Sequence, residues 1–417
     1  MATAEITIDS IATGGDGVGR ANGMVVFVPR TAPGDLISAR INAKGRFARG
    51  TLTSIERRSS ERVDPPCIHY VEDRCGGCQL QHINYGAQLA AKATIIRDGL
   101  TRVGKRAATA PTVEQSPSQW RYRTKLTLGF RRARSGWTIG LHPYDDPVGV
   151  FQLADCPITD ERVVAVWREI FAAAEHLPEG ATRGSVRMAD GGSVVVVEGG
   201  SSWPAARRFF DAGPSIGSLW WKPENQTRKA IASREGQPSA AVFAQVNPGM
   251  AQRLHSYVIE RARSYSPRSI VDAYAGSGAT AIQLANDGLR VTAIELDEAA
   301  AKATAGALRE PSRSIAARVE DVLPSTLPAD VVLVNPPRTG LADAVPTQLE
   351  HARGSIKALI YVSCNPATLG RDLARLPHFA IKSVRGFDMF PQTAHVETVC
   401  ELVPEAELVP RSGGDEG

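Results

Sequence analysis

The sequence has none of the features that direct a chain into or across a membrane. The segment from Met1 to Glu5 has no basic stretch followed by an apolar one, so no secretory signal is expected. No apolar run approaches the roughly 20 residues that span a bilayer. Cysteine is scarce as well, with six residues among 417. We therefore expect a cytoplasmic protein without a membrane partner, whose reduced thiols serve metal binding or catalysis rather than disulfides.

A strong net charge is also missing, because 48 basic and 44 acidic residues leave a formal charge of +4. Such a weak global field cannot attract a polyanion, so a nucleic-acid partner needs local basic patches. Residues 36–58 hold six basic residues against one acid, for which a solvated surface is the alternative explanation. Between residues 119 and 141, Arg121, Arg123 and Lys125 alternate with other residues, so a strand would place these cations on one face. We interpret this row as a candidate contact to nucleic-acid phosphates.

The pattern of apolar runs and turns predicts three consecutive domains. Residues 1–60 contain short strand-like runs separated by glycine-rich and proline-rich turns, which favours a small β-barrel of the oligonucleotide-binding type. Residues 61–240 form a mixed α+β region that contains four of the cysteines. Residues 241–417 alternate helical stretches with apolar runs, which indicates βαβ units and a parallel sheet of the α/β class. The expected strands of that sheet are residues 269–273, 289–294, 330–334 and 358–362.

Four cysteines of the middle region have spacing typical of a metal centre. Cys67, Cys75 and Cys78 lie close together in the sequence, and Cys156 follows far downstream. The two glycines between Cys75 and Cys78 let the loop wrap, so that successive thiolates can converge on one centre. Four thiolates suit either a tetrahedral zinc ion or a four-iron cluster, and the spacing alone does not decide between them.

A glycine-containing turn follows the first strand of the expected parallel sheet. Gly276 and Gly278 allow a tight turn and the close approach of a ligand, and Glu295 ends the next strand, where an acid can bind a ribose diol. Asp321 follows the presumed third strand, where a polar side chain could reach an adenine amino group. Ala281 replaces the third glycine of a dinucleotide fingerprint. Without a pyrophosphate to bind, the turn favours S-adenosylmethionine over NAD.

A polar-flanked thiol, Cys364, stands at the end of the expected strand 358–362. Asn335 begins the loop after the expected strand 330–334, which is the fourth of the sheet when the presumed strand before Asp321 is counted. Ligands of such sheets bind outside the carboxyl ends of the strands, so these loops should converge on one crevice. Covalent catalysis by a thiolate also requires a base, and His395 and Glu397 are the candidates downstream. The alternatives are a buried structural thiol and a surface carboxylate.

Three segments resemble the RNA uracil-5-methyltransferases, the family that makes 5-methyluridine in bacterial tRNA and ribosomal RNA. They are Cys75 to His82, Ser363 to Leu369 and Phe390 to Glu397. The resemblance implies a Rossmann-like, S-adenosylmethionine-dependent methyltransferase domain behind an N-terminal RNA-binding TRAM barrel and a central iron–sulfur domain. It also implies a [4Fe–4S] cluster held by Cys67, Cys75, Cys78 and Cys156. Seven residues separate Cys67 from Cys75, slightly more than is usual in the family.

The resemblance assigns roles to individual residues. Cys364 is expected to add to carbon 6 of uracil, and Glu397 to remove the proton from carbon 5. The expected contacts to the methyl donor are Gln245, Tyr274, Glu295, Asp321 and Asn335, with Gly276 and Gly278 shaping the turn. Two positions depart from the family: Asn335 stands where aspartate is usual, and Ala279 where asparagine is frequent.

The sequence therefore predicts a monomeric, S-adenosylmethionine-dependent enzyme that methylates carbon 5 of a uridine in RNA. Ribosomal 23S RNA is the favoured substrate and tRNA is the alternative, with Arg338 as a further RNA contact. An amino-methyltransferase also uses an Asn-Pro-Pro motif, but Arg338 replaces its stacking aromatic residue and Cys364 would have no use. A metal-stabilised RNA-binding factor that has lost catalysis is the remaining alternative.

Overall fold

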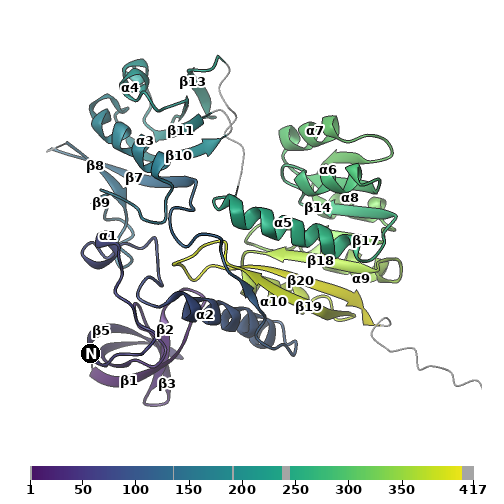
Figure 1. Ribbon diagram of the computed structural model, residues 1–417, viewed down its shortest axis with the longest axis horizontal. Helices are drawn as coiled ribbons and strands as arrows, with labels where there is room; N and C mark the ends of the chain where they lie inside the picture. The colour runs from purple at the N-terminus through teal and green to yellow at the C-terminus, as the bar shows by residue number, and fades with distance from the viewer. Residues whose placement is uncertain (1, 135, 190–191, 237–244, 406–417) are drawn as a thin grey trace, which may run out of the picture. The chain divides into compact units, whose positions relative to one another are not determined.

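The computed structural model describes residues 2–134, 136–189, 192–236 and 245–405 (Figure 1). By its contacts the chain divides into two compact units, each assembled from separate segments. The N-terminal unit contains residues 1–85, 117–249 and 390–394, and the C-terminal unit contains residues 86–116, 250–389 and 395–417. This division into two units does not test the three consecutive domains expected from the sequence, which stay a prediction. No helix in the described part of the chain has the length and apolar character needed to cross a membrane.

The N-terminal unit begins with a closed five-stranded barrel, as the sequence predicts. Its strands pair in the order β1-β2-β3-β5-β4. Alternate residues point inward, so that Ile6, Ile8, Val26, Val28 and Ile37 form a small buried core. The basic segment 36–58 supplies two of the strands. The barrel strands are β1 (Ala2–Ile11), β2 (Gly17–Ala21), β3 (Met24–Val28), β4 (Leu36–Lys44) and β5 (Phe47–Arg57).

A seven-stranded sheet forms the rest of the N-terminal unit, in the order β13-β12-β11-β10-β7-β8-β9. Helices α3 (Glu161–Ala172) and α4 (Ala206–Ala212) pack on it, and Phe130, Trp167 and Phe209 are buried in their shared core. The short helix α1 (Ile68–Val71) lies in the cysteine segment. The strands are β7 (Lys125–Ala133), β8 (Gly136–Leu141), β9 (Phe151–Gln152), β10 (Ala181–Ala189), β11 (Gly192–Gly199), β12 (Ser218–Lys222) and β13 (Lys229–Ser233).

The expected strand carrying Arg121, Arg123 and Lys125 on one face is wrong. Strand β7 begins only at Lys125, and Arg121 has a left-handed backbone with φ of 53°. The Arg121 guanidinium donates hydrogen bonds to both carboxylate oxygens of Asp155 at 2.9 and 2.8 Å. The Arg123 side chain turns back to donate to the carbonyl of Lys125 at 2.9 Å. A left-handed residue breaks the alternation on which the prediction relied.

The C-terminal unit is built on an eight-stranded sheet in the order β16-β15-β14-β17-β18-β20-β19-β6. Its first five strands are parallel, and β20 is antiparallel to both neighbours. The four strands expected from the sequence are confirmed within one residue at their ends. The strands are β14 (Ser269–Ala273), β15 (Arg290–Glu295), β16 (Arg313–Ala316), β17 (Val331–Val334), β18 (Ala358–Ser363), β19 (Phe379–Phe387), β20 (Glu397–Pro404) and β6 (Val113–Glu114).

Helices cover this sheet (Figure 1) and bury its mostly aliphatic strands. The segment 86–116 joins the unit through α2 (Tyr85–Asp98), the π-helical turn η1 (Gly99–Val103) and edge strand β6, which pairs with β19. Strand order reverses between β14 and β17, and ligands of open α/β sheets bind at such a switch point. The remaining helices are α5 (Pro248–Arg263), α6 (Ala279–Asn286), α7 (Glu298–Ala307), α8 (Val319–Thr326), α9 (Ala344–Ala352) and α10 (Pro366–Leu373).

Candidate active site

A cavity of about 620 Å³ opens at this switch point in the C-terminal unit. Tyr274, Glu295 and Asn335 line it, and each stands directly after or at the end of a parallel strand. Leu296 also lines it although 64% of its surface is exposed, which is unusual for a large apolar side chain. A partly apolar cavity with a few convergent polar groups is typical of a small-molecule site.

The turn that follows β14 contributes Tyr274 to the wall of this cavity. Tyr274, Gly276 and Gly278 all have left-handed backbones, with φ of 62°, 57° and 72°. The amide of Gly276 donates to the Glu295 carboxylate at 2.7 Å, which ties the turn to the end of β15. A side chain at Gly278 would overlap Thr304 of helix α7, so glycine is required there both by conformation and by packing.

Asp272, one residue before the end of β14, is an unusual buried acid. Only 5% of its surface is exposed, and its Oδ2 atom has no hydrogen-bond partner among the described residues. Burial, with a smaller contribution from the nearby Glu295 charge, raises its pKa to about 7. A buried polar atom without a partner costs free energy, and in a ligand site it marks a place for an additional donor.

Of the residues expected to contact the methyl donor, Asp321 and Gln245 are not among those that line this cavity. Asp321 is exposed on helix α8, and the turn before it contributes Arg318, Val319 and Glu320 to the cavity instead. Gln245 falls in the N-terminal unit, and its role stays a prediction. Leu296 was not expected from the sequence, although its position directly after Glu295, the acid that ends β15, could have indicated it.

The nucleophile candidate lies in a tight turn between β18 and α10. The Ser363 hydroxyl accepts from the Asn365 amide at 3.2 Å and donates to the Asn365 carbonyl at 3.0 Å. The Asn365 side chain caps helix α10 by accepting from the amides of Ala367 and Thr368. Cys364 stands between these two residues and is half-buried, whereas the other five cysteines are buried. The turn thus holds one accessible thiol in a fixed place.

Cys364, Glu397 and Arg338 interact electrostatically. Burial and the Glu397 charge raise the pKa of the Cys364 thiol, while Arg338, within hydrogen-bonding reach of the sulfur, lowers it. Glu397 begins β20 with only 6% of its surface exposed, and burial raises its pKa to about 7. The other base candidate, His395, is exposed. A thiol, a cation and a carboxylate that titrates near neutrality therefore meet in one place.

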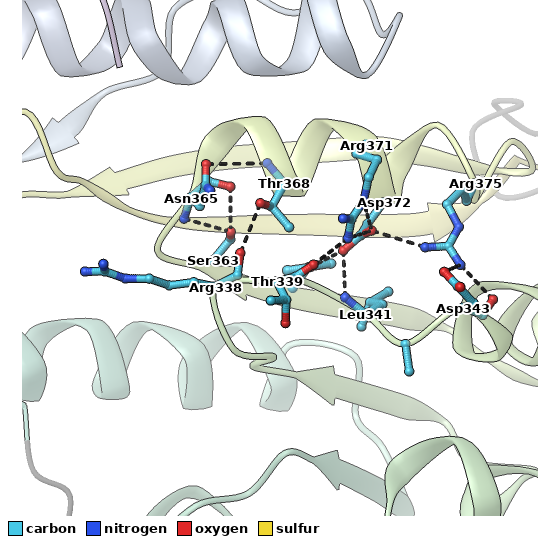
Figure 2. Close-up of polar contacts among 12 residues, drawn as sticks. Arg338, Thr339, Leu341, Asp343, Ser363, Asn365, Thr368, Arg371, Asp372 and Arg375 are labelled. Carbon is cyan, nitrogen blue, oxygen red and sulfur yellow. Dashed lines mark hydrogen bonds and ion pairs between the residues drawn. The ribbon is translucent and has the colours of Figure 1, made fainter. Parts of the chain in front are cut away.

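Helix α10 contacts the loop that follows β17 (Figure 2). Thr368 donates to the carbonyl of Arg338 at 3.1 Å, and Arg371 donates to the carbonyl of Thr339 at 2.7 Å. The amide of Leu341 donates to the buried carboxylate of Asp372 at 2.8 Å. Backbone atoms of Arg338, Thr339 and Leu341 therefore make hydrogen bonds to side chains on one face of α10.

The four cysteines of the N-terminal unit line one cavity of about 160 Å³. All four are buried and free of disulfides. Burial, with a smaller contribution from the neighbouring sulfurs, raises the pKa of Cys75 to about 11. Burial also raises the pKa of Cys78 and of Cys156. Across the described ranges, no group of three or more His, Cys, Asp or Glu residues has the arrangement for a metal ion.

Comparisons with known proteins agree with this geometry. The family model described as tRNA (Uracil-5-)-methyltransferase matches residues 307–403. An uncharacterized RNA methyltransferase of Thermosynechococcus vestitus is 30% identical over 445 residues, covering 96% of this chain and 98% of the relative. One from Protochlamydia amoebophila is 30% identical over 426 residues, covering 95% of this chain and 96% of the relative.

A solved structure shares the fold. The tRNA (uracil-54, C5)-methyltransferase of Pyrococcus abyssi, in complex with S-adenosyl-L-homocysteine, superimposes with a TM-score of 0.72 at 22% identity. The match covers 96% of this chain and 99% of that one, so the methyltransferase fold with an N-terminal closed barrel is confirmed. With relatives similar over their full length, the chain belongs to the family of S-adenosylmethionine-dependent RNA uracil-5-methyltransferases.

Proposed function

We propose that this enzyme methylates carbon 5 of one specific uridine by covalent catalysis, with Cys364 as nucleophile and Glu397 as base. The observation that supports this most is the pairing of a half-buried thiol with a buried carboxyl group close enough to shift its pKa. Covalent catalysis at a uracil ring requires a nucleophile and a base.

The chemistry needs both residues because carbon 5 of uracil is a poor nucleophile. Addition of the Cys364 thiolate to carbon 6 makes the ring an enolate, and carbon 5 then takes the methyl group that S-adenosylmethionine supplies. The Glu397 carboxylate next removes the proton from carbon 5, and the electron pair of that bond expels the thiolate. A carboxyl pKa of about 7 suits this step, because a base is most effective when it titrates near the working pH.

Arg338 supports the nucleophile in this proposal. Its positive charge lowers the pKa of the Cys364 thiol against the effects of burial and of Glu397. A guanidinium near the reacting ring can also contact RNA phosphate, the role expected from the sequence. The cavity at the switch point, lined by Tyr274, Glu295 and Asn335, is the methyl-donor cavity of this proposal, called the donor cavity below. The Asn335 amide can donate a hydrogen bond to uracil O4 and accept one from N3–H, but it cannot supply negative charge.

The donor cavity fits S-adenosylmethionine. Glu295 stands at the end of β15, where a carboxylate can bind the ribose hydroxyls, and the exposed Leu296 beside it offers an apolar surface for adenine. Gln245 and Asp321 remain proposed contacts because of the family resemblance, and Gly276 and Gly278 remain proposed contacts because their turn allows the close approach of a ligand.

We also propose that Cys67, Cys75, Cys78 and Cys156 hold a [4Fe–4S] cluster, with zinc as the alternative. Four buried thiols without disulfides line one cavity and supply the number and type of ligands that such a centre needs, although in this structure they are not arranged around a metal position. Such a centre would stabilise the loops that carry them. Iron, sulfide and zinc analysis of protein purified without oxygen distinguishes the two.

RNA contacts are proposed on the seven-stranded sheet and beside the nucleophile. Lys125 stands opposite Arg187 on β10. Burial lowers the pKa of Lys125, and the charges of Arg187, Arg183 and Arg123 lower it as well. Such a group favours a polyanion. Arg121 already pairs with Asp155, so we expect it to contribute least.

Ribosomal 23S RNA is the proposed substrate and tRNA the alternative, which the description of the Pyrococcus abyssi structure supports. Mapping 5-methyluridine in all RNA of a strain that lacks the gene decides between them. We expect one 23S position to lose its methyl group, to regain it with the wild-type gene, and to stay unmodified with Cys364→Ala. Loss at a tRNA position would establish the alternative. Unchanged 5-methyluridine everywhere would refute the proposal.

A further inference from the structure

Helix α10 starts directly after the nucleophile turn and is fixed from one side. A side chain on Gly370 would overlap the carbonyl of Gly99 in η1, and a side chain on Gly99 would overlap the carbonyl of Pro366 at the start of α10. Arg106 donates hydrogen bonds to the carbonyls of Leu373 and Leu376 beyond the helix end. With Asn365 capping its first turn, the helix has little freedom to move relative to Cys364.

The other side of α10 binds the loop after β17. Thr368 and Arg371 donate to the carbonyls of Arg338 and Thr339, and Arg375, just past the helix end, donates to the carbonyl of Asp343 at 2.6 Å (Figure 2). These side chains recur at intervals of three and four residues, which places them on one helix face. The loop is thus held mainly through its backbone carbonyls, with one ion pair from Arg375 to the Asp343 carboxylate at 3.2 Å in addition.

Asp372 is at the centre of these contacts and is completely buried. Its carboxylate accepts hydrogen bonds from the Leu341 amide at 2.8 Å, the Tyr361 hydroxyl at 2.7 Å and the Arg371 guanidinium at 2.7 and 3.0 Å. A side chain at Gly340, where φ is 85°, would overlap this carboxylate. Every partner is a donor, so the position requires a group that only accepts.

The loop held in this way serves two parts of the site. Thr339, Leu341 and Asp343 line the donor cavity. Arg338, at the start of the same loop, reaches the Cys364 sulfur, and Figure 2 shows its side chain extending away from the bonds to α10. The nucleophile turn and the cavity wall are therefore attached to one helix, at its start and along its face.

We propose that Asp372 is a positioning residue for methyl transfer, holding residues 338–343 in the conformation that shapes the donor cavity and presents Arg338 to Cys364. Its effect on the donor cavity concerns methyl-donor binding alone. Its effect on Cys364 rests on the covalent mechanism proposed above. The two effects have separate measurements, so the failure of one proposal is distinguishable from the failure of the other.

The first test is Asp372→Asn, which keeps the size of the side chain but replaces an acceptor with an NH₂ group among donors. We expect calorimetry to show S-adenosylhomocysteine bound at least tenfold more weakly. Glu401→Gln is the matched control, because Glu401 is also buried and accepts from Arg261, Tyr265 and Ser383. Control binding within twofold of wild type supports the proposal. Wild-type affinity in Asp372→Asn, or an equal loss in Glu401→Gln, overturns it.

A second variant tests whether α10 positions Arg338 if Asp372→Asn does not fold. Thr368→Val preserves shape and removes only the hydrogen bond to the Arg338 carbonyl. We expect a several-fold slower formation of the covalent adduct with RNA containing 5-fluorouridine, with S-adenosylhomocysteine affinity unchanged. Adduct formation at the wild-type rate overturns the positioning role of the helix. If the wild-type enzyme itself forms no adduct, the covalent mechanism fails, whereas the binding measurements on Asp372 keep their meaning.

Discussion

Replacing Glu397 with glutamine should stabilise the protein at alkaline pH and also block its turnover. Glu397 is buried, and its pKa of about 7 lies above the ordinary value of 4.5. At 1.36 kcal/mol per pKa unit, this difference amounts to about 3 kcal/mol of unfavourable ionisation in the folded state. Glutamine has nearly the same size and does not ionise, so the variant avoids this cost.

The sign of the pH dependence follows from proton binding. Between pH 4.5 and about 7 the folded carboxyl keeps its proton while the unfolded one has lost it, so the unfolded state binds fewer protons. The contribution of Glu397 to stability is therefore fully present below pH 4.5, falls as pH rises to about 7, and is constant above. Glu401→Gln should behave oppositely, because hydrogen bonds from Arg261 and Tyr265 lower the Glu401 pKa to about 2.

The assay must report on the C-terminal unit. All six tryptophans lie between residues 120 and 221, in the N-terminal unit, so their fluorescence does not report on β20. Hydrogen exchange of the β20 amides, measured at pH 5.5 and pH 8, follows the correct region. We expect Glu397→Gln to gain protection relative to wild type at pH 8, and to show less than half of that free-energy gain at pH 5.5. Equal profiles at both values would refute the raised pKa.

The same variant tests the role of Glu397 in the reaction. Without a base for the carbon-5 proton, the thiolate cannot leave, so the enzyme should accumulate as a denaturation-resistant covalent complex with uridine-containing RNA. A gel that separates free enzyme from the complex measures this. Rapid, normal turnover would remove Glu397 from the mechanism even if the stability result held.

Three further predictions concern the thiols and their cation. Cys364→Ala should abolish both methylation and the adduct with 5-fluorouridine RNA, and an adduct that persists would exclude it as the nucleophile. Arg338→Met should raise the pKa of the Cys364 thiol, so the pH–rate profile should move to higher pH. Each pKa unit of that rise leaves up to tenfold less thiolate at neutral pH. An unshifted profile would exclude an electrostatic role of Arg338. Cys78→Ser should remove the brown colour and the iron of anaerobic protein, whereas Cys400→Ser, a buried cysteine outside the cavity, should retain both.

The sequence predicts best what depends on local patterns and on general rules for parallel sheets. Short apolar runs located β14, β15, β17 and β18, and the rule that ligands bind at the carboxyl ends of strands brought Tyr274, Glu295 and Asn335 to one cavity. These inferences needed only periodicity and strand order.

The remaining features depend on backbone conformation and on packing between distant segments. The left-handed backbone of Arg121 and its ion pair with Asp155 cannot be read from an alternating pattern. Glu320 lines the cavity and Asp321, one residue later on α8, does not, because a sequence pattern does not fix the residue at which a helix begins. The role of Asp372 depends on donors from three separate segments, which only the folded chain brings together.

The pairing of β6 with β19 constrains when the C-terminal unit can fold. Residues 86–116 leave the ribosome early, yet their strand and helix partners lie between residues 250 and 389. At typical synthesis rates the interval is roughly 15 to 55 seconds, during which α2 and β6 have no sheet to join. The apolar residues Ile95, Ile96 and Leu100 stay unburied for that time. Expression at slow translation rates should therefore increase aggregation and chaperone dependence, and a truncated chain ending before residue 389 should not complete this unit.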